Sequence, residues 1–218
     1  MDNWELFLFA NTKKKNSSSA EEMLKALIDR SVTNIDIPEG TPAIGSQVFN
    51  QCRNLTSVTI PNSVTNIGSY AFTNCNSLAN LTIPTGVTRI LTNVFYGCSS
   101  LTSIEIPNGV VSIGTNAFTN CSSLISLTIP ASVTSIEGNS FADCSSLSNV
   151  TLGNGFNANG LNLSASTLYS IDTIVAVLDA LADRTSQVAY TLIFGSTNLA
   201  KLSNEQIAIA TEKNWTLA

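Results

Sequence analysis

Cysteine is the residue whose spacing in this 218-residue chain first suggests chemistry. The cysteines recur every 23 residues, as Cys52, Cys75, Cys98, Cys121 and Cys144. Regularly spaced thiols could bind a metal ion or form disulfides. However, equivalent places of stacked units point their side chains in parallel, whereas zinc needs converging ligands and a disulfide needs a defined torsion. We therefore interpret the cysteines as a column of small buried apolar side chains, and we predict no metal site and no cofactor.

Few other residues are available for catalysis. The chain has no histidine, which removes Ser-His-Asp and Cys-His sites as well as histidine metal ligands. Only 11% of its residues are charged, against about 25% in an average protein. The sequence also lacks the GxxxxGK[ST], GxSxG and HExxH motifs. We predict that the protein is not an enzyme and has no catalytic residues.

The charge pattern excludes two classes of partner. The net charge is −5, and Lys13-Lys14-Lys15 is too short a basic run to indicate nucleic-acid binding. No stretch of about 18 apolar residues exists, so we expect no membrane insertion. The acidic start of the chain and the short apolar run 6–10 do not predict a signal peptide.

The same period of 23 governs three residue types at once. Prolines at 38, 61, 84, 107 and 130 and phenylalanines at 49, 72, 95, 118 and 141 keep step with the cysteines. The repeating units are 32–54, 55–77, 78–100, 101–123 and 124–146. Apolar residues occupy places 1, 4, 6, 10, 13, 17, 18 and 21 of a unit, a spacing that fits neither one helix nor one long strand. Each unit is therefore predicted to be a coil that buries its faces by stacking.

Local patterns predict the course of a coil. In the second unit, Val58-Thr59-Ile60 alternates as a short strand does, and Pro61 ends it because proline has no N–H for a further ladder bond. Ile67-Gly68 is predicted to be a turn. Leu91 and Glu137 replace the glycine of that turn, which predicts a different turn geometry in their units.

The units resemble the BspA-like leucine-rich repeats, whose consensus is close to LxxIxIPxxVxxIGxxAFxxC. The second unit, LTSVTIPNSVTNIGSYAFTNCNS, and the fourth, LTSIEIPNGVVSIGTNAFTNCSS, carry the resemblance most clearly. It implies a curved bacterial solenoid, a fold described in surface adhesins, and hence a location at the cell surface. The compartment itself stays open.

Both ends of the stack need a cover. Over residues 1–31 we predict a helical cap, with a capping box at Ser19 to Glu22 and a weaker strand signal around Trp4, Phe7 and Phe9. Residues 147–156 read as a degenerate sixth unit, so that the repeats span 32–156. Residues 157–218 are predicted to form an α/β cap with helices over 170–184 and from Ser203 to about Lys213, and strands over 188–194 and 214–217.

The predicted strands place one set of residues on the outer face of a sheet. Places 3 and 5 of each unit flank the inward place 4 and form a nearly neutral Ser/Thr/Asn surface. Threonine also simply suits a strand, so this composition has a structural explanation as well. If the protein binds a partner through its sheet, we expect the face to consist of Asn34, Asp36, Ser57, Thr59, Asn80, Thr82, Ser103, Glu105, Ser126, Thr128, Asn149 and Thr151.

Two smaller features of the sequence are candidate sites. Asp36 and Glu105 are the carboxylates of the face, but strand spacing separates them by about 14 Å, beyond the limit of about 9.5 Å for a glycosidase pair. Tyr70 and Tyr96, with Arg89 on another turn, suggest an aromatic contact patch, although exposed tyrosines also occur without a function.

These patterns predict a non-enzymatic binding or adhesion module that presents its polar face to a protein or glycan. The alternative is a structural or attachment component of a larger assembly, such as a phage tail or a multi-domain surface protein. In either case we expect a monomer or a weak oligomer. Affinity should be modest and only weakly dependent on salt, because few charges take part.

Overall fold

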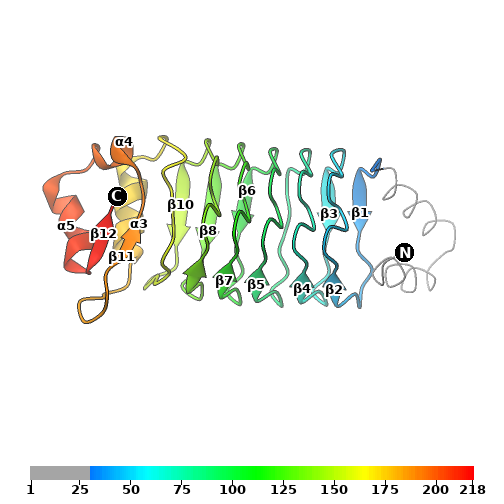
Figure 1. Ribbon diagram of the computed structural model, residues 1–218, viewed down its shortest axis with the longest axis horizontal. Coiled ribbons are helices and arrows are strands. Elements are labelled where there is room, and N and C mark those ends of the chain that lie inside the picture. The colour runs from blue at the N-terminus through cyan, green and yellow to red at the C-terminus, as the bar shows by residue number, and fades with distance from the viewer. Residues whose placement is uncertain (1–29) are drawn as a thin grey trace.

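The computed structural model describes residues 30–218, which form an elongated stack of coils (Figure 1). Residues 23 positions apart lie side by side in neighbouring coils, as the pairing of Ile35 with Val58 shows. The predicted leucine-rich-repeat solenoid is therefore confirmed. The cap predicted over residues 1–31 falls, apart from its last two residues, outside the described part of the chain.

The front wall of the solenoid is a parallel ladder at places 3 to 5, where the alternation predicts a strand. Asn80 extends the first part of this ladder through an isolated bridge to Ser57, and the ladder then starts again in the fourth coil. The two parts are therefore separate sheets. Their strands are β1 (Asn34–Asp36) and β3 (Ser57–Thr59), followed by β6 (Ser103–Glu105), β8 (Ser126–Ile129) and β10 (Asn149–Leu152).

A second wall corrects one prediction. Ile67 lies in a short strand immediately before the turn, and similar strands recur at places 12 and 13 of each coil. Strands this short bury a single side chain each, so the sequence alternation was too brief to reveal them. They are β2 (Ala43–Ile44), β4 (Asn66–Ile67), β5 (Arg89–Ile90), β7 (Ser112–Ile113) and β9 (Ser135–Ile136).

The second wall is interrupted between β4 and β5, where Leu91 replaces the glycine of place 14. A Cβ on Gly68 would lie 2.4 Å from the backbone nitrogen of Ser46 in the preceding coil. Leu91 carries a side chain at the same place, and β4 and β5 belong to different sheets. Glu137 also replaces the glycine, yet its N–H still donates to Ile113 O at 2.8 Å. The predicted change of turn geometry thus agrees with the interruption at Leu91. It is wrong for Glu137, whose backbone N–H keeps the hydrogen bond to the preceding coil.

A third wall, at places 16 to 20, is continuous. The N–H groups of Phe49, Phe72, Phe95 and Phe118 each donate to a carbonyl of the next coil at 2.8–2.9 Å. Residues at places 16 and 20 adopt positive φ in every coil, as Tyr70 (62°) and Gly97 (72°) show. This repeated left-handed geometry turns the chain while leaving backbone N–H groups aimed along the stack.

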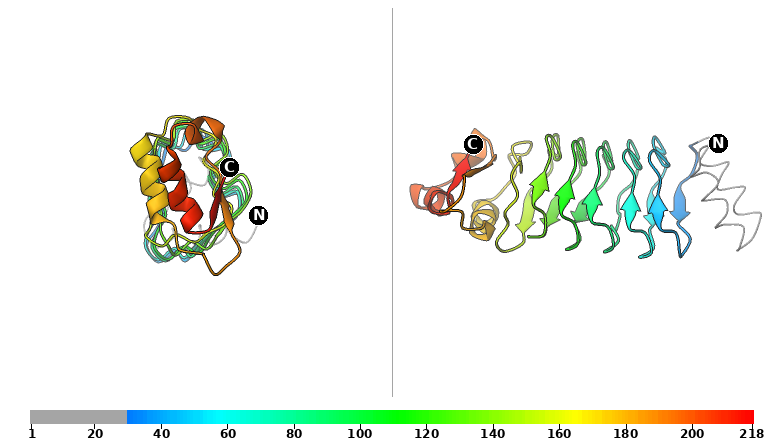
Figure 2. Two further views of the ribbon diagram at one scale, coloured as in Figure 1. Left: turned by 90° about the vertical axis from the view of Figure 1, so that its left-hand side faces the viewer. Right: turned by 60° about the horizontal axis from the view of Figure 1, so that its bottom comes forward.

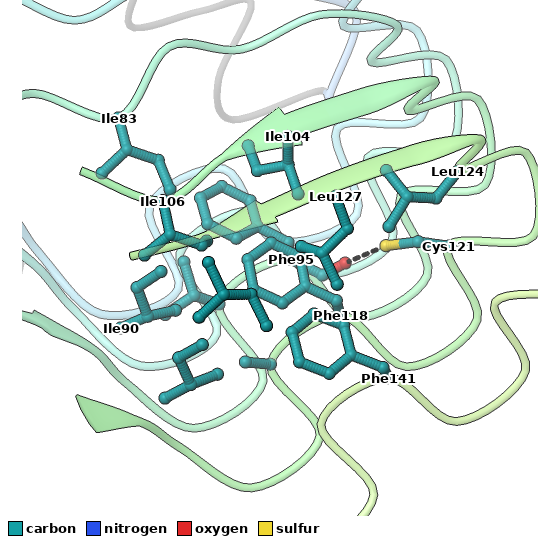
Figure 3. Packing of buried hydrophobic residues seen from close by; sticks show 14 of the residues in the cluster. Ile83, Ile90, Phe95, Ile104, Ile106, Phe118, Cys121, Leu124, Leu127 and Phe141 are labelled. Carbon is teal, nitrogen blue, oxygen red and sulfur yellow. Dashed lines mark hydrogen bonds between the residues drawn. The ribbon is translucent and has the colours of Figure 1, made fainter. Parts of the chain in front are cut away.

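The core runs the length of the stack. The Phe95 and Phe118 rings are stacked with centroids 5.3 Å apart, and stacking continues from Phe49 to Phe141 (Figure 3). Large apolar side chains contribute roughly 1.5–3 kcal/mol each when fully buried. In the sixth unit, Leu147, Val150, Leu152 and Phe156 are buried as the repeat pattern predicts.

Beyond the coils, the chain folds back over the end of the stack. Helix α3 (Ile171–Ala180) packs against β10, and helices α3 and α5 (Asn204–Glu212) lie across the oval cross-section in Figure 2. The remaining elements are α4 (Ser196–Leu199), β11 (Tyr190–Leu192) and β12 (Trp215–Leu217), and β11 and β12 pair in parallel.

Two predicted elements of this region are shorter than expected. The helix that begins after Ser170 ends at Ala180, because Leu181 leaves it to form a bridge with Phe156. The strand predicted over 188–194 covers only 190–192. Val188 stands in an exposed loop whose carbonyl accepts from the Arg184 guanidinium. The predicted Ser203 capping box is present and opens α5.

Candidate partner-binding face

The front strands place the predicted residues on one surface. Each strand buries its middle side chain and turns its neighbours outward, so Val58 is buried while Ser57 and Thr59 are exposed. Register aligns the columns, because Ser126 pairs with both Ser103 and Asn149. The residues at places 3 and 5 are exposed, apart from half-buried Ser126 and Thr128.

Polar groups on this face are mostly unused by the protein itself. Ser57 Oγ donates to Asn34 Oδ1 at 2.6 Å. Among the described residues 30–218, the other side chains at places 3 and 5 form no hydrogen bonds with the protein. Hydroxyls on the other walls behave differently, since Thr73 Oγ1 donates to Asn93 O at 2.6 Å in the next coil. Most polar groups at places 3 and 5 therefore stay available to a partner.

A groove of about 290 Å³ opens on the front wall between the third and fourth coils. Its lining includes Thr82, Ile83 and Thr85 from one coil and Glu105, Pro107 and Asn108 from the next. It lies at the interruption between Asn80 and β6, the point at which the two sheets of this wall are separated. The sequence predicts that Thr82 and Glu105 lie on the face, but it does not predict the groove.

Place 9, which borders the groove at Gly109, differs in residue type from coil to coil. In the second and fifth coils that place holds Ser63 and Ser132, whose hydroxyls donate to carbonyls of the preceding coil at 2.9 and 2.8 Å. The third and fourth coils have Gly86 and Gly109 instead. A Cβ on Gly109 would lie 3.0 Å from Thr85 O, so this glycine allows the fourth coil to approach the third closely beside the groove.

The electrostatics of the front wall and of the segments on either side of it are one-sided. Across places 1 to 9 of all the coils, the sequence has the carboxylates Asp36, Glu39 and Glu105 and no lysine or arginine. Asp36 pairs across the ladder with Thr59, and Glu105 with Thr128, so the two belong to separate sheets with the second and third coils between them. The structure does not bring them together as an acid–base pair.

The cysteines lie inside the stack. All five are free and buried, as the sequence interpretation predicts. The Cys121 thiol donates to Phe95 O at 3.4 Å, and the same contact recurs at Cys75, Cys98 and Cys144 (Figure 3). Burial raises the pKa of the Cys144 thiol to about 12 and raises the pKa of Cys121 well above its usual range.

The tyrosine patch is not assembled as a unit. Tyr70 is 39% exposed, while the Tyr96 hydroxyl accepts a hydrogen bond from Asn120 Nδ2 at 3.1 Å. Arg89 lies in β5 on the second wall, where its Nε donates to Ser112 Oγ. No ring contact joins the two tyrosines within residues 30–218.

Stacked coils with a parallel ladder at places 3 to 5 define a solenoid of the leucine-rich-repeat class. The family model described as "BspA type Leucine rich repeat region (6 copies)" matches residues 25–148 and, in an overlapping match, residues 65–175. The chain therefore belongs to the BspA-type leucine-rich-repeat family. No curated protein sequence matches it.

Solved structures of bacterial leucine-rich-repeat proteins are similar to this one. A leucine-rich cell surface protein from Faecalibacterium prausnitzii A2-165 is 38% identical over 56% of this chain and 32% of its own, with a TM-score of 0.54. A leucine-rich-repeat protein from Eubacterium ventriosum ATCC 27560 is 30% identical over 57% of this chain and 33% of its own, with a TM-score of 0.51. This chain thus spans about a third of each of those proteins.

A third structure supports the fold alone. The leucine-rich-repeat protein of T. pallidum is 23% identical, covers 85% of both chains and has a TM-score of 0.62.

None of the helices within residues 30–218 has the length and apolar character needed to cross a membrane.

Proposed function

We propose that the protein is a non-enzymatic binding module of the adhesion type, which presents its front wall to a protein or glycan at a cell surface. The observation that carries this proposal is the alignment of exposed, unsatisfied polar side chains at places 3 and 5. A rigid array of such groups suits many shallow contacts, as on other solenoids. The likeness to a leucine-rich cell surface protein supports the location.

The proposal includes the manner of binding. With few charges on the face, affinity should be modest and only weakly dependent on salt. The chain acts as a monomer or a weak oligomer, and it binds neither nucleic acid nor the membrane interior. It has no catalytic role, since the two carboxylates of the face belong to separate sheets.

A second candidate is a structural or attachment component of a larger assembly. The observation in its favour is that this chain corresponds to only about a third of two similar proteins. Solenoids of this type therefore occur as parts of longer chains. Under this proposal the front wall contacts a neighbouring part of the assembly and not a host or matrix molecule.

A binding array of matrix proteins and glycans tests the first proposal. Thr59→Arg, Thr82→Arg and Thr128→Arg each place a bulky charge on the front wall, and each should abolish binding to whichever array member the unmodified protein retains. Thr88→Arg is the matched control, because Thr88 is exposed next to β5 on the second wall. If the three front-wall variants bind as well as Thr88→Arg does, the front wall is not the site.

A further inference from the structure

The groove between the third and fourth coils has an apolar floor and a polar rim. Ile83 is almost fully buried beneath it, and the half-buried Pro107 ring forms part of one side. The exposed side chains around these two residues are Thr82, Thr85, Glu105 and Asn108. A ligand that enters the groove therefore meets hydrocarbon below and oxygen atoms at the edge.

The charge of the rim is unbalanced. Glu105 has no ion-pair partner among residues 30–218, and places 1 to 9 of every coil lack lysine and arginine. Hydroxyl oxygens of Thr82 and Thr85 and the amide oxygen of Asn108 add further hydrogen-bond acceptors. The groove thus offers a carboxylate with neighbouring acceptors to a cation.

We propose that this groove binds a basic side chain, lysine or arginine, presented by a polypeptide partner. This inference rests on the proposed function, because the groove is part of the front wall. The methylene stem lies along Ile83 and Pro107, and the charged head pairs with the Glu105 carboxylate. Long basic side chains bury their stems against apolar surface and keep the charged end at a polar edge.

The lining favours a polypeptide over a glycan. Neither the groove lining nor places 3 and 5 of the front wall contain an aromatic ring on which the apolar face of a sugar would stack. A single carboxylate above an apolar floor matches the combination of hydrocarbon and positive charge that a basic side chain carries. The groove therefore favours a protein over a glycan as the partner.

A titration of the ¹⁵N-labelled full chain, followed by NMR, tests the proposal. The probes are Ac-Ala-Lys-Ala-NH₂, its arginine counterpart and the norleucine counterpart, which keeps the stem without the charge. The basic peptides should shift the backbone amide signals of Thr82, Glu105 and Asn108. Norleucine should bind about threefold more weakly, in line with the contribution of one exposed ion pair. If the norleucine peptide shifts these signals as much as the basic peptides do, the proposed pairing of the charged head with Glu105 is wrong.

Paired variants isolate the carboxylate. Glu105→Gln keeps the size of the side chain and should weaken binding of the lysine peptide about threefold, to the level of norleucine. Glu39→Gln removes an exposed carboxylate from the turn of the first coil and should leave binding unchanged. If Glu105→Gln binds the lysine peptide as the unmodified chain does, the proposal is wrong.

Further arms separate this inference from the proposed function. Methyl N-acetylglucosaminide and maltose are titrated in parallel, and shifts at the groove with either sugar but not with the basic peptides would overturn the polypeptide assignment. If neither class shifts these signals while Thr59→Arg still abolishes array binding, the groove proposal falls and the front wall remains the binding surface.

Discussion

Serine and threonine hydroxyls have two different roles in this molecule. Outside the front wall several of them donate to carbonyls of a neighbouring coil, as Thr119 Oγ1 does to Asn139 O at 2.5 Å and Thr134 Oγ1 to Val111 O at 3.2 Å. On the front wall most of them have no protein partner. The low charge of the chain therefore reflects two needs, coil-to-coil hydrogen bonding and a free polar surface, and composition alone does not separate them.

At the residue scale, the buried thiols make stability dependent on pH. Thiols of the unfolded chain ionise near pH 9, whereas burial raises the pKa of Cys144 to about 12 in the folded state. Above pH 9 the unfolded state holds fewer protons than the folded state, so stability is complete below pH 9 and falls as the pH rises towards 12. The expected loss is about 1.4 kcal/mol per pH unit for each such thiol.

Urea unfolding at pH 8, 9 and 10 measures this slope. Cys144→Ala serves as the comparison, because it removes one titrating thiol and leaves tyrosine and lysine ionisation in place. Its stability should be lower at pH 8 but should fall less steeply with pH. Identical slopes for the two proteins would contradict the attribution to the buried thiol.

At the scale of elements, the sequence predicts the repeated elements. It does not reveal elements that are very short or that depend on contacts between distant residues. Shared places for proline, phenylalanine and cysteine predict the coils, the front strands and the candidate face. The second wall was missed because a two-residue strand such as β4 has no readable alternation. The sequence does not predict the groove, because its lining comes from two neighbouring coils and depends on how they pack, and the end of α3 depends on a bridge to Phe156.

The junction between the first two coils offers a test of close approach. Gly68→Ala would place a Cβ 2.4 Å from Ser46 N, a backbone atom that cannot rotate away. We expect a loss of about 1–3 kcal/mol in the free energy of unfolding, as in other overpacked sites. The measurement is the urea midpoint of the variant.

Gly138→Ala is the matched control for this junction. Nothing lies within 4 Å of a Cβ at Gly138, and its φ is outside the left-handed region. Its unfolding free energy should stay within about 0.5 kcal/mol of the unmodified protein. Equal losses at the two glycines would contradict the attribution of the cost to contact with Ser46, because replacing glycine by alanine at an open site lowers only the entropy of the unfolded chain, which is stabilising.

For the whole molecule, the period makes coils interchangeable. The coils from Val32 to Ser146 share the third-wall hydrogen bonds and the phenylalanine column, so a missing coil leaves matching surfaces there on both sides. Deleting residues 101–123, which joins Ser100 to Leu124, should therefore give a folded, shorter solenoid of lower stability. Circular dichroism and thermal melting would detect it.

A deletion of residues 102–123 provides the control for register. It removes one residue fewer and shifts every apolar side chain beyond the join by one place. We expect this protein not to fold cooperatively. If both deletions melt alike, contact between equivalent places does not determine the stacking.

The uneven walls have a mechanical consequence. Hydrogen bonds of the third wall join each coil to the next from the first to the fifth. The second wall, in contrast, is interrupted after β4 and the front wall before β6. A stretching force along the axis is therefore expected to bend the molecule. The third wall, which carries the phenylalanines, holds the coils together while the interrupted walls separate. The first yield would come at the third coil, dividing the solenoid into two blocks before either block unravels.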